Sequence, residues 1–215
     1  MIRVMNETKT KSIKTASKDI LARLLASEDI AVEHRAAAQT ASFDTKSRVL
    51  ILPIWENMDD ALYDMLVGHE VAHALWTPAD EWAKHINRFG AINRGPWMTF
   101  VNIVEDARIE RKIKDKFPGL RRDFFHAYAD LYERDIFEIE GKDLTDLPLI
   151  DRLNLHFKIG PHTSIPFTAS ENEAGVIESL ENTKSFADVV EVAANLFEQW
   201  LDEQPEPPQE DEQQE

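Results

Sequence analysis

The motif His69-Glu70-Val71-Ala72-His73 lies within an apolar run from Met58 to Trp76. Residues four apart lie one above the other on a helix, so the two histidines can direct their imidazoles at one metal ion. Glu70 can hold a water beside that metal and accept its proton. Zn²⁺ fits two neutral imidazoles and a carboxylate, with one position left open. The pattern therefore predicts a zinc-binding helix that carries its own general base.

The residues around this motif favour a helix. Asp59 and Asp60 favour its start through the helix dipole, and Thr77-Pro78 ends it. Gly68 costs about 1 kcal/mol of helix propensity relative to alanine. A small residue at this position suits the close approach of another backbone or a substrate. Apolar residues at helical spacing can face a core while the histidines face a cleft: Leu62, Met65, Leu66, Ala72 and Leu75. The alternative is a buried helix with two satisfied histidines.

A catalytic zinc ion usually takes three protein ligands, and the helical run 96–117 supplies the candidates for the third. Glu105 and Asp106 lie in its apolar half, where an uncompensated carboxylate is costly. We predict Glu105 as the third ligand and Asp106 as the residue that orients a ligand histidine, with Asp106 as ligand the alternative. Asn102, one turn earlier, is predicted to hold a carboxylate or contact substrate. A solvated helix face is the other interpretation, because Arg108-Ile109-Glu110-Arg111-Lys112 follow directly.

Two strings in this region resemble a known family: residues 63–78 (YDMLVGHEVAHALWTP) and residues 102–110 (NIVEDARIE). They are similar to the N-terminal metallopeptidase-like region of phage proteins related to the cobaltochelatase CobT subunit, which usually carry a C-terminal von Willebrand A domain. The similarity runs from about Met5 to the end of the segment Phe124–Phe137. It implies a zincin-like fold, a zinc peptidase-type site and a MoxR-class AAA+ ATPase as partner. The chain departs from the whole family protein, because no von Willebrand A metal motif (Asp-x-Ser-x-Ser) occurs in its 215 residues.

Composition and charge restrict the class of protein. A chain of 215 residues with 43% hydrophobic residues predicts one domain with a substantial core. The net charge of −16 makes a nucleic-acid partner an unfavoured interpretation, although Arg108 to Arg122 holds seven basic residues. The absence of cysteine excludes disulfides and thiolate chemistry. No signal-peptide or membrane-span pattern occurs, so we expect no membrane association and a cytoplasmic location, in the host cell if the chain is phage-encoded.

The chain divides into four expected parts. Residues 1–14 form a flexible N-terminus, and residues 15–140 form the zincin-like metallopeptidase core. Residues 141–203 are a C-terminal helical subregion packed on that core. Residues 204–215 hold five acidic residues and three prolines and no apolar residue, which predicts a disordered acidic linker or tail. The predicted fold class is therefore α+β, mainly α.

The core is predicted to begin with a helix over 15–28 and a small sheet. Ile30–His34 reads as a strand, and the runs 40–44 and 48–53 flank Thr45-Lys46-Ser47 as a hairpin. A hairpin or three-stranded sheet directly before the metal-binding helix is the zincin arrangement, and its edge can receive a substrate backbone by strand addition. A hairpin that only covers the core is the equal alternative.

Further helices are predicted over 120–136, 148–158, from 170 and over 185–202, the last strongly amphipathic. Zinc peptidases often add a tyrosine or histidine that donates to the oxyanion of the tetrahedral intermediate. The nearby candidates for that role are His126, Tyr128 and Tyr132.

The predicted function is a zinc metallopeptidase that acts on a peptide or protein substrate, with Glu70 as base and His69, His73 and Glu105 as zinc ligands. The first alternative is a catalytically silent adaptor or chelatase-like subunit that works with a MoxR-class AAA+ ATPase. A purely structural metal domain is the second. The intact Glu70 favours catalysis, because a structural zinc site needs no general base. The acidic tail and the missing downstream domain favour the adaptor.

Overall fold

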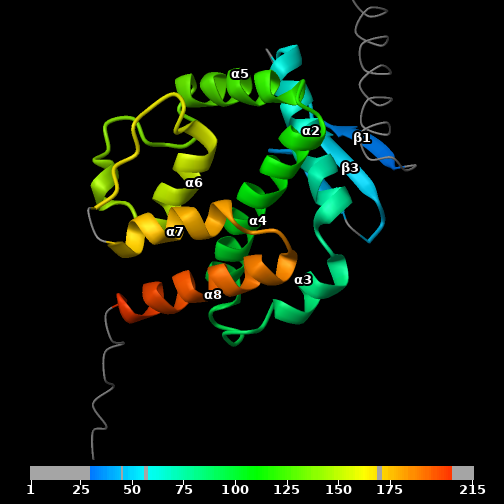
Figure 1. The fold of residues 1–215 in the computed structure, drawn as a ribbon. Helices are drawn as coiled ribbons and strands as arrows, with labels where there is room; N and C mark the ends of the chain where they lie inside the picture. Colours follow the sequence, from blue (N-terminus) through cyan, green and yellow to red (C-terminus); the bar gives the residue numbers. More distant parts are fainter. Residues whose placement is uncertain (1–29, 45, 56–57, 169–170, 205–215) are drawn as a thin grey trace, which may run out of the picture.

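The computed structural model describes residues 30–44, 46–55, 58–168 and 171–204. Within these residues the chain is mainly helical with one small sheet, which confirms the α+β, mainly α prediction (Figure 1). The elements follow in the order β1 (Ala31–Arg35), β2 (Ser42–Asp44), β3 (Val49–Pro53), α2 (Asp60–Trp76), α3 (Ala79–His85), α4 (Arg94–Lys116), α5 (Leu120–Glu133), the 3₁₀ turn η1 (Leu144–Asp146), α6 (Leu149–Ile159), α7 (Glu171–Glu181) and α8 (Phe186–Asp202). The predicted flexible segment 1–14, the helix 15–28 and the tail beyond Gln204 lie outside the described residues.

The sheet has the strand order β1-β3-β2, so β3 is central and β2 lies at an edge. β1 pairs parallel to β3, whereas β2 pairs antiparallel to it with Phe43 opposite Leu50, which confirms the predicted hairpin. The carboxylate of Asp44 stabilises the turn by accepting a hydrogen bond from the Ser47 backbone N–H at 3.2 Å. The central strand carries the fully buried Leu50 and Leu52, which pack the sheet on α2.

Helix α2 carries the histidine motif, and its start and packing follow from single residues. Asp59 is the N-cap, and its side chain accepts a hydrogen bond from the Leu62 N–H at 2.7 Å. A Cβ atom at Gly68 would lie 3.1 Å from Leu120 Cδ1 and 3.3 Å from Phe124 Cε2. The small residue therefore permits the close approach of α5. The side chains of Leu120 and Phe124 occupy the space beside Gly68.

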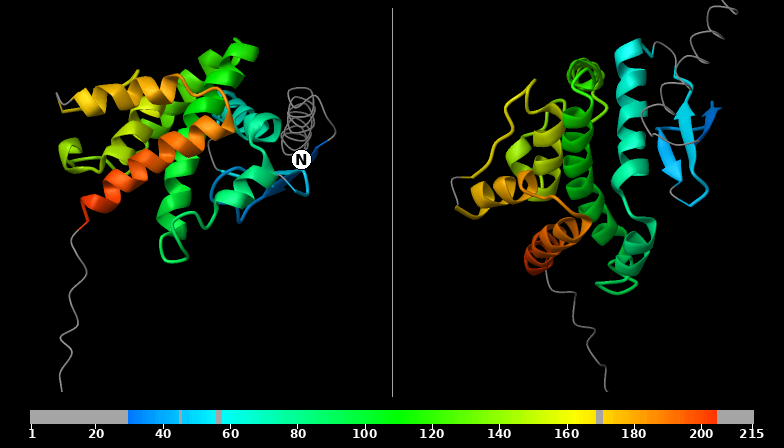
Figure 2. Two further views of the ribbon diagram at one scale, coloured as in Figure 1. Left: turned by 60° about the horizontal axis from the view of Figure 1, so that its bottom comes forward. Right: turned by 45° about the vertical axis from the view of Figure 1, so that its right-hand side comes forward.

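Helix α4 is the central element of the molecule. In the right-hand view of Figure 2 it stands beside α2, with the sheet on the far side of α2 and helices α6, α7 and α8 on the opposite side of α4. Its first half contributes Trp97 and Val101 to an apolar cluster with α8, and its second half contributes Ile109 and Ile113 to the cluster around α2 and the sheet. A helix buried on so many sides can keep polar side chains only where they have partners.

Among the helices that the structure describes, none combines the length and the apolar character that crossing a membrane requires.

Candidate metal centre

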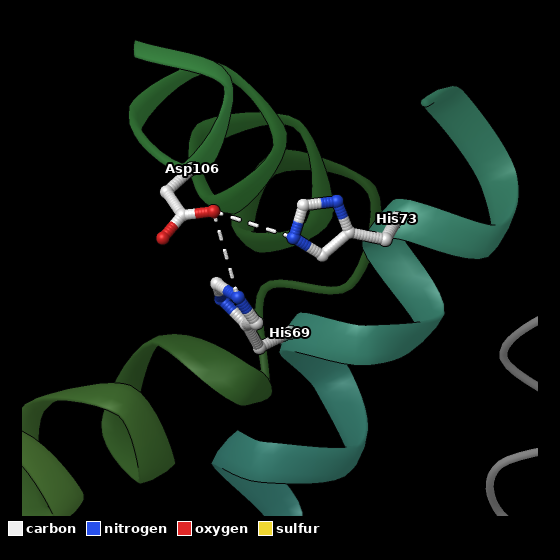
Figure 3. A group of neighbouring side chains, drawn as sticks. All are labelled: His69, His73 and Asp106. Carbon is white, nitrogen blue, oxygen red and sulfur yellow. Dashed lines mark ion pairs between the residues drawn. The ribbon is translucent and has the colours of Figure 1, made fainter. Parts of the chain in front are cut away.

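The two histidines of α2 and Asp106 of α4 converge on one point (Figure 3). Asp106 Oδ1 lies 3.3 Å from Nε2 of His73 and 3.7 Å from Nε2 of His69. One potential ligand atom from each residue lies within 4.8 Å of the other two. All three side chains are largely buried, with exposures of 16% for His69, 15% for His73 and 5% for Asp106. This group of two imidazoles and a carboxylate can hold a metal ion.

The carboxylate of Asp106 has one satisfied oxygen and one unsatisfied oxygen. Oδ2 accepts a hydrogen bond from Lys158 Nζ at 3.0 Å. Oδ1, the oxygen that faces the histidines, is buried and accepts no hydrogen bond from the residues described. An unpaired buried acceptor is costly, so its persistence between two imidazoles fits a cation ligand. The residues present therefore fit the metal ion that the sequence motif implies.

The hydrogen bonds behind the histidines fix which ring nitrogens are free. His69 Nδ1 lies 3.1 Å from Glu110 Oε1, which can only accept, so Nδ1 carries a proton. His73 Nδ1 lies 3.0 Å from Thr77 Oγ1, whose own proton goes to Glu105 Oε1 at 2.5 Å. Thr77 must therefore accept from His73. Both Nδ1 atoms are donors, and both Nε2 atoms are left for a metal.

Glu105 does not lie with the histidines, which corrects its prediction as third ligand. Its side chain is fully buried and forms a two-pronged ion pair with Arg108, at 2.8 Å from Nε and 2.7 Å from Nη2. Thr77 donates to the same carboxylate. Consecutive helix residues point about 100° apart, so only one of Glu105 and Asp106 can face α2 directly. Asp106 takes the position beside the histidines, and Glu105 supports His73 through Thr77.

Glu110 is a functional candidate that the sequence motifs did not single out, because it lies in the run whose alternative interpretation was a solvated helix face. It is 3% exposed, and its Oε1 contacts His69 Nδ1 and accepts a hydrogen bond from Tyr128 Oη at 2.5 Å. Its place four residues after Asp106, one helical turn away on the same face, was the pattern that could have identified it. Lys158 had no comparable local pattern, because it comes from α6, far along the chain.

Burial and charge shift several pKa values at this site. Burial disfavours the imidazolium of His69, but the charge of Asp106 and the hydrogen bond to Glu110 outweigh it and raise the pKa to about 9. Burial would raise the pKa of Asp106, yet the charges of Lys158 and His69 hold it well below its ordinary value. Burial raises the pKa of Glu70 although both histidines oppose this shift. A proton and a metal ion therefore compete for His69.

His69, His73, Asp106 and Lys158 line a cleft with a volume of about 560 Å³. Glu70 lies in its wall beside the histidines, and Asn102, which is exposed, lines it as well. The edge strand β2 contributes Ser42 and Phe43 to the lining of the same cleft. The cleft thus combines a candidate metal centre, a buried carboxylate that can act as a base, and a strand edge.

The three predicted oxyanion donors lie in different places. Tyr128 lines the cleft, but its hydroxyl donates to Glu110. His126 lines a separate acidic groove with Asp59 and Asp123, and Tyr132 packs against the core and is absent from the residues that line the cleft. Lys158 is a charged donor that does line the cleft.

Comparison with models of known protein families, with curated proteins and with solved structures gives no match.

Proposed function

We propose that this chain is a zinc-dependent metallopeptidase domain with a zincin-like arrangement of an edge strand over a metal-binding helix. One observation carries the proposal: the buried Oδ1 of Asp106 accepts no hydrogen bond from any residue that the structure describes, and it faces Nε2 of both His69 and His73. Asp106 takes the role that the sequence analysis gave to Glu105. Two imidazoles and a carboxylate form a ligand set that zinc peptidases use.

Each surrounding residue has a defined task in this mechanism. Bound Zn²⁺ would supply a Lewis acid that lowers the pKa of a water and polarises a substrate carbonyl. Glu70 would take the proton of the attacking water and return it to the leaving amine nitrogen, and its raised pKa suits that double role. Glu110 and Thr77 hold the two histidine rings in orientation.

The edge strand β2 suggests how a peptide would bind. Ser42 and Phe43 line the cleft, and β3 pairs with only one side of β2 among the described strands. An extended peptide could add its backbone to the other side and place an amide bond over the metal centre. The substrate class is therefore an unfolded or extended polypeptide segment.

The experiment is cleavage of a peptide library by the zinc-loaded chain, with Glu70→Gln as the variant. Glutamine keeps the size of Glu70 but cannot accept the proton, so the cleavage rate should fall about 10²–10⁴-fold while zinc content and melting temperature stay unchanged. A chelator should abolish cleavage by the parent. Equal rates for parent and variant would overturn the assignment of Glu70.

The adaptor or chelatase-like role with a MoxR-class AAA+ ATPase remains the alternative proposal. It predicts that the chain binds zinc and cleaves no peptide, and that Glu70→Gln has no effect on binding of the ATPase. The buried general base beside the histidines favours the peptidase, because an adaptor does not need it.

A further inference from the structure

Lys158 is a residue of the C-terminal helices that reaches the candidate metal centre. It belongs to α6, which packs against α4 and α5 through buried neighbours such as Leu155 and Ile159. Its side chain is only 19% exposed, and its Nζ donates to Asp106 Oδ2 at 3.0 Å. It also lines the cleft. A segment distant from the histidine motif thus contacts the carboxylate beside both histidines.

The contact divides the two oxygens of Asp106 between two partners. A carboxylate can bind a metal through one oxygen or through both. Here Oδ2 accepts a hydrogen bond from the Lys158 ammonium, while Oδ1 faces the two Nε2 atoms and has no hydrogen bond within the described part of the chain. A charge-assisted hydrogen bond of this kind is among the stronger polar interactions in a buried site. Oδ2 is therefore held away from the role of a metal ligand.

Lys158 also alters the charge balance of the site. Asp106, Glu70 and Glu110 are buried acids close enough to act electrostatically on Lys158. An ammonium group among them reduces the negative charge that a bound metal would experience. The metal would then bind less tightly, but it would attract the electrons of a substrate oxygen more strongly.

We infer that Lys158 is a positioning residue that restricts Asp106 to one-oxygen ligation and so keeps a coordination position open for water and substrate. This inference rests on the proposed metal site and deepens it. It predicts opposite effects on two quantities: loss of Lys158 should raise the affinity for the metal and lower the rate of catalysis. A lysine needed only for folding would weaken both.

The test is visible absorption spectroscopy of the full chain loaded with Co²⁺, together with Co²⁺ and Zn²⁺ titrations. In Lys158→Met, Oδ2 becomes free to bind the metal, so the absorption should weaken towards that of a five-coordinate ion. The affinity for both metals should rise about tenfold or more, because a nearby positive charge is removed. Lys158→Arg should keep the spectrum of the parent.

Lys114→Met is the matched control. It removes a lysine that lies 3.5 Å from Glu110 Oε2, but no contact to Asp106, so the cobalt spectrum should keep its intensity. If Lys158→Met does not fold, Lys158→Gln decides: its amide N–H can still occupy Oδ2, so it should show the parent spectrum with raised affinity. An unchanged spectrum in Lys158→Met, or a fall in affinity in either neutral variant, would overturn the inference. These readouts need no peptide cleavage, so a catalytically silent chain would leave the inference intact.

Discussion

Glu105 and Asp106 are adjacent on α4 and both are buried, yet their surroundings are opposite. Glu105 lies in a closed cluster where Arg108 and Thr77 occupy both of its oxygens. Asp106 lies in an open cluster where one oxygen contacts Lys158 and the other has no hydrogen-bond partner among residues 30–44, 46–55, 58–168 and 171–204. Burial alone therefore does not identify a metal ligand. The distinguishing feature is a lone pair that the protein leaves unsatisfied next to other ligand atoms.

Removal of the cation in the closed cluster should have the largest effect on folding. Arg108→Met leaves the Glu105 carboxylate buried without its partner, so the free energy of unfolding should fall by about 3–5 kcal/mol. Denaturant unfolding of the chain measures this loss. The control Arg121→Met removes an exposed ion pair with Asp115 and should change stability by less than about 1 kcal/mol. Equal losses in the two variants would show that the buried ion pair of Glu105 and Arg108 contributes no more to stability than an exposed one.

Removal of the unsatisfied carboxylate in the open cluster should mainly affect metal binding. Asp106→Asn replaces a charged ligand by a neutral amide, so zinc affinity should fall by more than the roughly 10–100-fold typical of a lost supporting residue. Competition with a chromogenic chelator measures the affinity. Full zinc affinity in this variant would remove Asp106 from the ligand set.

The open cluster should also make the stability of the chelator-treated chain depend on pH. The pKa of His69 is raised from 6.5 to about 9 in the fold, so its protonation stabilises the fold fully below pH 6.5. That contribution, up to about 3 kcal/mol, should be lost as the pH rises through 9. Zinc-saturated protein should not show this loss, because the bound metal has already displaced the proton and the contribution from protonation is absent. Denaturant melts at several pH values test this, and a metal-free stability that is constant across this window would contradict the assigned shift.

The smallest expected effect comes from a residue behind a ligand. Glu110→Gln keeps an acceptor for His69 Nδ1 but removes the charge, so zinc affinity should fall about 10–100-fold. Isothermal titration with zinc measures it. Affinity equal to that of Asp106→Asn would contradict the assignment of Asp106 as a zinc ligand and Glu110 as a residue that only orients His69.

Local sequence patterns predicted most of the fold. The β-prone runs around Thr45-Lys46-Ser47 gave the hairpin, and the 3.6-residue apolar period gave α2, α4, α5 and α8, because these elements form from neighbouring residues. The choice between Glu105 and Asp106 depended on the rotation of α4 about its axis. That rotation is set by packing against both α2 and α8, which no local pattern records.

The same reasoning explains the residues that were missed at the site. His69 and His73 were identifiable because their spacing lies on one helix. Lys158 reaches Asp106 only because α6 packs beside α4, since the two residues are 52 positions apart in the chain. Its contact with Asp106 follows from tertiary structure alone.

The most direct measurement is anomalous X-ray diffraction at the zinc absorption edge, on crystals of the parent chain grown with Zn²⁺. The account predicts one anomalous peak within bonding distance, about 2.0–2.2 Å, of His69 Nε2, His73 Nε2 and Asp106 Oδ1. It also predicts that Glu105 remains paired with Arg108. A zinc ion bound by Glu105, or no peak between the histidines, would contradict it.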